Sequence, residues 1–200
     1  MSDFPPEFDA DDRRDVAWMD AVKQGDMDAF ERLVETHQAK IIGTAAKMLG
    51  DAGDAEDIAQ QVFVRVWNSA DRYEPTARFT TWLFKITRNL TFNELRRRKR
   101  HPVSSLESEL GSRVLQLQDP QSKLASAVLI EQEVQTAIQA AIDGLPEVQR
   151  MAVVLRRYQD VSYEEIGKIL DLSVPAVKSV LFRARTQLRE RLRGFLSGED

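Results

Sequence analysis

The chain contains no cysteine and only two histidines, His37 and His101. The lack of cysteine excludes a disulfide framework, a thiolate metal site and a cysteine nucleophile, and two isolated histidines do not make a metal cluster. No apolar run approaches the roughly 20 residues that span a bilayer, and the acidic N-terminus lacks the basic and then apolar pattern of a signal peptide. We therefore expect a cytoplasmic protein without membrane insertion, bound metal or other cofactor.

An overall excess of positive charge is also lacking, because the formal net charge is -4. Phosphate would repel the mean charge, so any role in binding nucleic acid must depend on local basic patches. Residues 78–100, RFTTWLFKITRNLTFNELRRRKR, form one such patch and end in five consecutive cations. The sequence has no phosphate-binding loop or catalytic constellation, which predicts a protein that is not an enzyme and has no small-molecule substrate.

Strand-like alternation is absent, and apolar residues recur at the three- and four-residue spacing that is typical of helices. This pattern predicts an all-α fold of two small helical domains joined by a flexible linker, with a helix-turn-helix in the C-terminal domain. The expected parts are a disordered acidic tail over 1–15, a domain over 16–101, a serine-rich linker over 102–123 and a second domain over 124–197.

Residues 161–192 carry the pattern of a helix-turn-helix. Ser162 followed by Glu165 predicts a capping box that opens a short helix. After a tight turn, Ser173 can cap a second helix that has Pro175 in its first turn. The second helix of this motif enters the major groove of DNA, so its small and basic outer residues are candidates for duplex binding. The alternative is a solvated surface with ordinary arginines.

The patch at residues 78–100 predicts a helix with one largely basic stripe. Its members are Lys85, Arg88 or Asn89, Phe92, Arg96 and Lys99. Tyr73, Phe79 and Trp82 flank a loop beside this helix, and aromatic rings next to cations can hold unstacked bases while the cations hold the backbone. Two alternatives stay open: the terminal cations suit the negative end of the helix dipole, and the rings suit a hydrophobic core.

Three stretches together resemble the extracytoplasmic-function (ECF) subfamily of the sigma-70 sigma factors of bacterial RNA polymerase. They are DAEDIAQQVFVRVW (54–67), RFTTWLFKITRN (78–89) and LPEVQRMAVVLRRYQDVSYEEIGKILDLSVPAVKSVLFRARTQLRERL (145–192). The linker lies where this subfamily lacks the middle domain of larger sigma factors. The resemblance implies a promoter-specificity subunit whose partners are core RNA polymerase, through its beta-prime clamp coiled coil and beta flap, promoter DNA and an anti-sigma factor.

The resemblance also assigns three sets of site residues. Asp57, Gln60 and Gln61 would contact the polymerase clamp, with Phe63 as a core anchor. The residues implied for minus-10 recognition and melting are Tyr73, Arg78, Phe79, Thr81, Trp82, Lys85, Arg88, Asn89, Arg96 and Lys99. The residues implied for minus-35 recognition are Ser162, Tyr163, Ser173, Pro175, Ala176, Lys178, Ser179, Arg183 and Arg185.

The sequence departs from the common subfamily pattern at a few of these positions. Pro175 and Ala176 stand where Gly-Thr is common, and Gln61 stands where an acid is common, so the promoter sequence of a relative cannot be transferred to this chain. Two other hypotheses are kept beside the sigma factor. One is a helix-turn-helix regulator that binds an operator without joining polymerase, and the other is a helical interaction protein whose basic run is only surface.

Overall fold

The computed structural model describes residues 8–100 and 123–193, with the side chains of 123–132 left out. The described part is helical, which confirms the predicted all-α fold. Its elements are α1 (Ala10–Lys23), α2 (Met27–Leu49), α3 (Ala52–Asn68), the short 3-10 helix η1 (Ala70–Arg72), α4 (Phe79–Arg100), α6 (Lys123–Asp143), α7 (Glu147–Tyr158), α8 (Tyr163–Leu170) and α9 (Val174–Arg191). None of these helices has the length and apolarity that a membrane span requires. The linker predicted over 102–123 lies almost entirely outside the described residues.

The prediction of a disordered acidic tail over 1–15 is partly wrong. Asp9 and Asp12 cap α1 reciprocally, and the helix runs from Ala10. Asp12 and Asp15 are buried, with Asp15 Oδ2 lying 2.9 Å from His37 Nε2. Composition marked these carboxylates as too polar to pack, but capping and charged partners satisfy them inside the fold. Residues 1–7 of the predicted tail lie outside the described residues.

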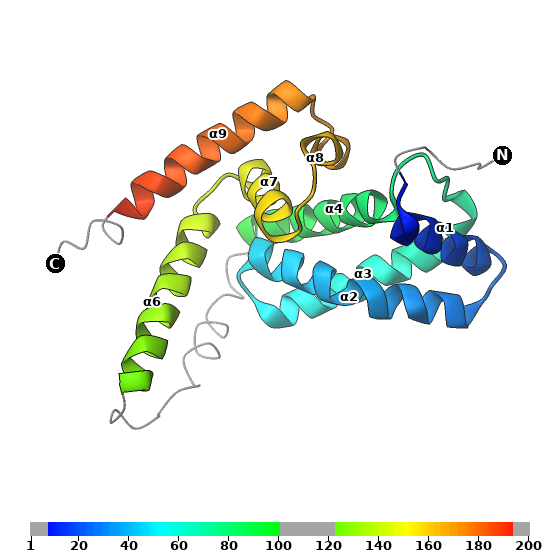
Figure 1. Ribbon diagram of the computed structural model, residues 1–200, viewed down its shortest axis with the longest axis horizontal. Coiled ribbons are helices and arrows are strands. Elements are labelled where there is room, and N and C mark those ends of the chain that lie inside the picture. Colours follow the sequence, from blue (N-terminus) through cyan, green and yellow to red (C-terminus); the bar gives the residue numbers. More distant parts are fainter. Residues whose placement is uncertain (1–7, 101–122, 194–200) are drawn as a thin grey trace.

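The N-terminal domain is a bundle of α1 to α4, in which α2 and α3 run side by side (Figure 1). Leu33, Ile41 and Met48 of α2 are fully buried against Val62 of α3 and Leu83 of α4. Burying a side chain of this size stabilises a fold by roughly 1.5 to 3 kcal/mol. The bundle thus fixes which faces of α3 and α4 remain for other contacts.

The C-terminal domain places α7, α8 and α9 around a second set of buried side chains, including Met151, Leu155 and Ile166. Its tight turn requires glycine in α8, because a Cβ on Gly167 would lie 2.7 Å from the backbone oxygen of Leu172. The turn has the geometry of a helix-turn-helix, as predicted.

The two domains lie against each other, with α4 beside α8 and α2 beside α7 (Figure 1). The side chain of Arg150 is buried between them, and its Nη1 donates to the backbone oxygen of Met48 over 2.6 Å. This hydrogen bond satisfies a carbonyl at the C-terminal end of α2, where the helix itself offers no donor. These contacts between the domains were not predicted, because they join residues that are far apart in the chain.

Candidate nucleic-acid interface

One face of α3 is free of the bundle. Ile58 and Phe63 are buried, whereas Asp57, Gln60 and Gln61 are exposed on the other side of the helix. Asp51 caps the helix by accepting a hydrogen bond from the Asp54 amide. The structure therefore places Phe63 inward and Asp57, Gln60 and Gln61 outward, as the sequence predicted.

The basic stripe of α4 faces the C-terminal domain. Lys85 Nζ lies 3.0 Å from Asp171 Oδ1, and Arg88 Nη1 lies 2.8 Å from Asp171 Oδ2. Near the end of the helix, Lys99 Nζ lies 2.7 Å from Glu147 Oε1. Three cations that were predicted to bind DNA are thus paired with acids of the other domain.

The first turn of α4 makes a similar contact. Thr81 is buried, and its Oγ1 donates to Glu165 Oε1 over 3.2 Å. Arg78 Nε lies 3.5 Å from the same oxygen and 3.2 Å from Asp12 Oδ2. Desolvation raises the pKa of Asp12 above its ordinary value, against the lowering effect of its hydrogen bond from Asp9 and of Arg78. Arg78, the residue before α4, therefore pairs with acids of both α1 and α8.

Other residues of the stripe remain open to solvent. Asn89 and Arg96 are exposed, and the side-chain oxygen of Asn89 accepts from Arg88. Arg96 has no acidic partner among the residues that the structure describes, and its Nε donates only to the backbone oxygen of Phe92. Arg96 is therefore the member of the terminal run best placed to meet an external phosphate.

Arg97 and Arg98 of the same run have structural partners. Arg97 Nε lies 2.7 Å from Glu94 Oε2, and Arg98 donates to the backbone oxygen of Leu49 as well as to Glu94 and Asp54. Part of the run thus fastens α4 to the end of α2. Arg97 and Arg98 thus have structural roles through specific partners, whereas a favourable interaction of the terminal cations with the helix dipole stays a prediction.

The aromatic rings beside α4 are not arranged as the sequence predicted. Tyr73 is 3% exposed and Phe79 is 0% exposed, so neither ring offers a face on which a base could stack. Their ring centroids lie 6.1 Å apart, and both rings pack on Trp82, which is half-buried. Burial also raises the pKa of the Tyr73 hydroxyl above its ordinary value. The predicted stacking of a base on Tyr73 and Phe79 is wrong for this fold, because both rings belong to the core.

The helix-turn-helix has the predicted caps. Ser162 and Glu165 form the capping box of α8, and Ser173 accepts from the Ala176 amide at the start of α9. The hydroxyls of both serines thus hold helix ends. Tyr163 is half-buried, with the guanidinium of Arg156 5.4 Å from its ring centroid.

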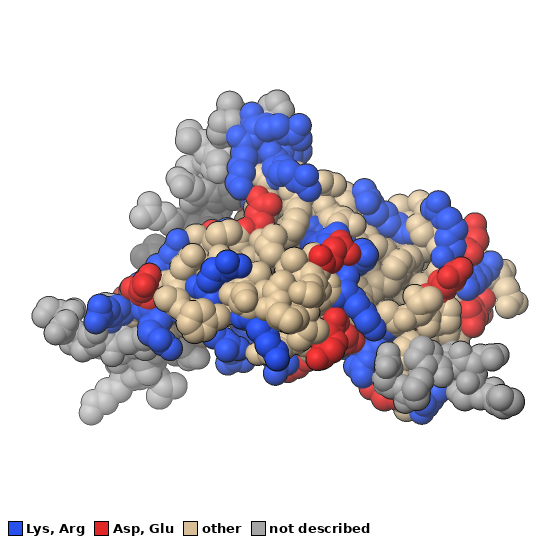
Figure 2. All heavy atoms as spheres, turned by 90° about the horizontal axis from the view of Figure 1, so that it is seen from above, with Lys and Arg blue, Asp and Glu red and all other residues tan. Residues whose placement is uncertain are grey.

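The two sides of α9 differ in character. Val177, Val180, Leu181 and Ala184 are buried against the domain, as predicted. The exposed residues on the other side include Pro175, Lys178, Ser179, Phe182, Arg183 and Arg185. Figure 2 shows the molecule from above relative to Figure 1, and basic side chains are scattered over this face with acidic ones between them. The outer side of α9 is thus a basic surface on the helix that a helix-turn-helix inserts into the major groove.

Family models match the chain in two places: Sigma-70 region 2 over residues 33–101 and Sigma-70, region 4 over residues 135–188. The ECF RNA polymerase sigma factor SigW of Bacillus subtilis (strain 168) is 35% identical over 86% of this chain and 93% of its own length. The ECF RNA polymerase sigma-E factor of Escherichia coli (strain K12) is 30% identical over 89% of this chain and 94% of its own length. The chain belongs to the ECF sigma factors of the sigma-70 family.

Solved structures with the same fold include CnrH in complex with the cytosolic domain of CnrY, at a TM-score of 0.64 and 23% identity over 94% of this chain and 99% of that one. Another is the sigma factor RpoE in complex with the anti-sigma factor NepR from Bartonella quintana. Its TM-score is 0.60, and it is 23% identical over 82% of this chain and 96% of that one. In this ECF sigma factor, the α3 face and the α4 stripe fall within region 2, and the helix-turn-helix falls within region 4.

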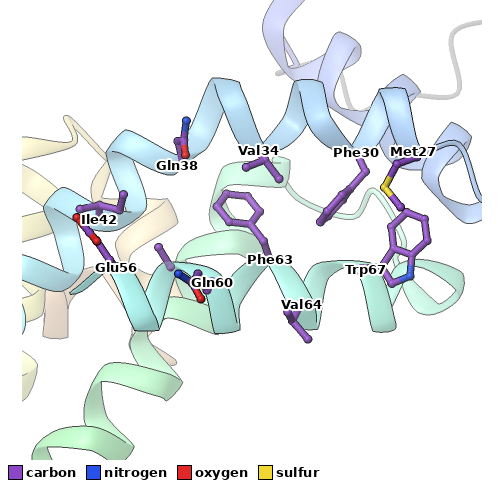
Figure 3. Close-up of a pocket in the computed structure, with 11 residues that line it drawn as sticks. Met27, Phe30, Val34, Gln38, Ile42, Glu56, Gln60, Phe63, Val64 and Trp67 are labelled. Atoms are coloured by element: carbon purple, nitrogen blue, oxygen red, sulfur yellow. The ribbon is translucent and has the colours of Figure 1, made fainter. Parts of the chain in front are cut away.

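Sequence reasoning missed an apolar groove in region 2 of this ECF sigma factor. The groove has a volume of about 770 Å³ between α2 and α3, and its walls include Phe30, Val34 and Phe63 (Figure 3). Val64 at its edge is 58% exposed and follows Gln60 by one helical turn. The signal in the sequence was Val64, an apolar residue on the side of α3 that otherwise carries the polar residues Asp57 and Gln60. The groove therefore lies next to the polar face of α3.

Proposed function

We propose that this ECF sigma factor binds core RNA polymerase, directs it to specific promoters and helps to open the minus-10 element. The observation that carries the proposal is the presence, in one chain, of a basic α4 suited to a single strand and a basic α9 suited to duplex DNA. A regulator that only occupies an operator needs the second surface and not the first. The relatives named as RNA polymerase sigma factors support the same choice.

For the polymerase, we assign the exposed polar face of α3. Asp57, Gln60 and Gln61 are free of the bundle while Phe63 anchors the helix beneath them. A partner can therefore bind this face without disturbing the core. We assign the beta-prime clamp coiled coil to it, and the beta flap to the C-terminal domain.

For the minus-10 element, we assign the cations of α4 to the phosphates of one strand and the loop before α4 to a base. Phosphate contacts position a strand without reading its sequence, so a separate feature must read the base. Residues 74–77 form this loop and are at least partly exposed, while Tyr73 and Phe79 support the loop from inside the core.

For the minus-35 element, we assign the outer side of α9. Arginine and lysine can bind guanine edges in the major groove, while an apolar side chain can contact the methyl group of thymine. Lys178, Arg183 and Phe182 offer both chemistries on neighbouring turns of one helix. Ser162 and Ser173 are assigned here only as caps that hold the two helices of the motif.

The complexes of CnrH with CnrY and of RpoE with NepR lead us to propose an anti-sigma factor as a further partner of this chain. Such a partner would act in the cytoplasm, where we also place this sigma factor. The chain itself is proposed to be an initiation factor and not an enzyme, so polymerase supplies all of the chemistry.

In vitro transcription tests the proposed function. The full chain is added to core polymerase and genomic DNA, and transcript starts are sequenced; starts downstream of a shared motif are expected. Asp57→Lys should reduce these starts without loss of helicity, since the Asp57 side chain is exposed. Glu35→Lys, at an exposed position of α2, serves as the matched control. Tight operator binding by the chain alone, with no polymerase-dependent starts, would support the regulator instead.

A further inference from the structure

The contact between the two domains has a consistent charge pattern. Four ion pairs cross it among the described residues, and in each pair the cation belongs to the N-terminal domain and the acid to the C-terminal domain. They are Arg78–Glu165, Lys85–Asp171, Arg88–Asp171 and Lys99–Glu147. The C-terminal domain therefore offers to α4 the charge that a DNA strand would offer.

Asp171 is the centre of this contact. It ends α8 in the left-handed conformation, with φ 56° and ψ 46°, and each of its carboxylate oxygens meets a different cation of α4. Hydrogen bonds from Arg88 and then Lys85 lower the pKa of Asp171 below its ordinary value. Arg88 Nη1 also donates to the backbone oxygen of Ile169 over 2.6 Å. The negative end of α8 thus presents a carboxylate and a carbonyl to two cations one turn apart.

We propose that the acidic end of α8 occupies the strand-binding surface of α4 in the free chain, so that the C-terminal domain and single-stranded DNA compete for the same cations. The inference rests on the proposed function of α4. Exposed ion pairs are individually weak, so a binding partner that holds the domains apart can release the surface. A free chain would then bind a single strand poorly, and the strand would gain access once polymerase separates the domains.

Two substitutions remove the acids while keeping their local roles. Asn tolerates the left-handed conformation, so Asp171→Asn removes the charge and keeps the turn. Gln can replace Glu in a capping box, so Glu165→Gln keeps the cap of α8. Asp160→Asn is the matched control, because Asp160 also has a positive φ of 51°, lies in the same domain and makes no ion pair with the described residues.

The first measurement is the affinity of the full chain for an oligodeoxythymidylate of about twelve nucleotides, a length that a single-strand groove can hold. Asp171→Asn should tighten binding about threefold, and the double variant with Glu165→Gln about tenfold, given the small contribution of each exposed pair. Asp160→Asn, which changes net charge equally, should bind as the parent does. Equal affinities for Asp171→Asn and Asp160→Asn would overturn the proposal.

The second measurement is the distance between spin labels at Glu31→Cys in α2 and Glu190→Cys in α9, which the absence of native cysteine makes straightforward. In the free parent chain the distribution of this distance should be narrow, and adding the oligonucleotide should broaden it. Asp171→Asn should reach the same broadening at a lower oligonucleotide concentration. Binding without any change in distance would overturn the competition. With saturating core polymerase, the parent and Asp171→Asn should bind the strand with equal affinity. A difference in affinity that persists under this condition would also count against the competition. Polymerase-dependent transcription by all variants would leave the proposed function intact even if the competition fails.

Discussion

The two basic helices of this sigma factor differ in what covers them. On α4, Lys85, Arg88 and Lys99 are each paired with an acid of the other domain. On α9, Lys178 and Arg183 are exposed and have no acidic partner among the described residues. The free chain therefore leaves the cations of its proposed duplex-reading surface unpaired among the described residues, whereas three cations of its proposed strand-binding surface are paired with acids and Arg96 stays open.

This difference fits the order in which promoter DNA becomes available. A promoter is first a duplex, and a single strand exists only after opening, so the strand-binding surface has no use before polymerase is present. Pairing of the α4 cations with acids also limits binding to unrelated single-stranded nucleic acid, because phosphate contacts do not distinguish sequences. The comparison predicts that substitutions on the two helices have effects of different kinds.

The largest expected effect concerns the core beneath α4. Phe79→Ala should lower the free energy of unfolding by about 3 to 5 kcal/mol, because it removes a ring that is fully buried. Chemical denaturation followed by circular dichroism measures this change. Trp82→Ala is the matched control and should cost less, since its ring is half-buried. A Phe79→Ala chain of unchanged stability that fails only in promoter opening would restore the base-stacking role.

The aromatic residues show where sequence reasoning reached its limit. The spacing of Tyr73, Phe79 and Trp82 placed three rings near one loop, and the structure does bring them together. Spacing alone could not tell which rings face inward, because that depends on how α4 sits against α1 and α2. The sequence assigned all three rings to the minus-10 element, but Tyr73 and Phe79 are buried and only Trp82 reaches the surface.

A second expected effect concerns duplex readout by α9. Arg183→Ala should cost about 1 to 3 kcal/mol on promoters that offer it a guanine and little on others, because a bidentate base contact depends on sequence. Competition among a library of minus-35 variants, followed by sequencing of transcripts, measures this selectivity. Arg189→Ala, at an exposed arginine in the last turn of the same helix, is the matched control. Uniform loss across the library would reassign Arg183 to a phosphate.

Local patterns predicted the C-terminal domain better than the N-terminal surface. Ser162, Glu165 and Ser173 signalled their helix ends because a cap depends on residues three positions apart. The helical start at Ala10 was missed although Asp9 and Asp12 form a capping box three positions apart, because the acidic composition of the segment was weighted above this local pattern. The burial of Asp12 and Asp15 beside Arg78 and His37 could not be predicted locally, since these partners are distant in sequence. The contact of Asp171 with α4 was missed for that reason too, because it joins residues more than 80 positions apart.

A smaller effect is expected at the exposed end of α4. Arg96→Ala should weaken all promoters similarly and lower the slope of log affinity against log salt concentration by about one, because it removes one phosphate contact. Arg97→Ala is the matched control, since Glu94 already neutralises that guanidinium. Binding of the polymerase complex to several promoters over a range of salt concentrations measures both slopes. Equal slopes for Arg96→Ala and the parent would remove Arg96 from the strand-binding surface.

The smallest expected effect concerns Phe182, which is 71% exposed on the outer side of α9. If its ring contacts a thymine methyl group, replacing the thymines of the minus-35 element with uracil should cost the parent about 0.8 kcal/mol or less for each methyl. Phe182→Ala should bind both templates equally, because the partner of the methyl group is gone. Phe182→Leu, which keeps an apolar side chain, should retain part of the preference. A parent that binds the two templates with the same affinity would show that this ring does not read thymine, and would leave the exposed phenylalanine for a protein partner.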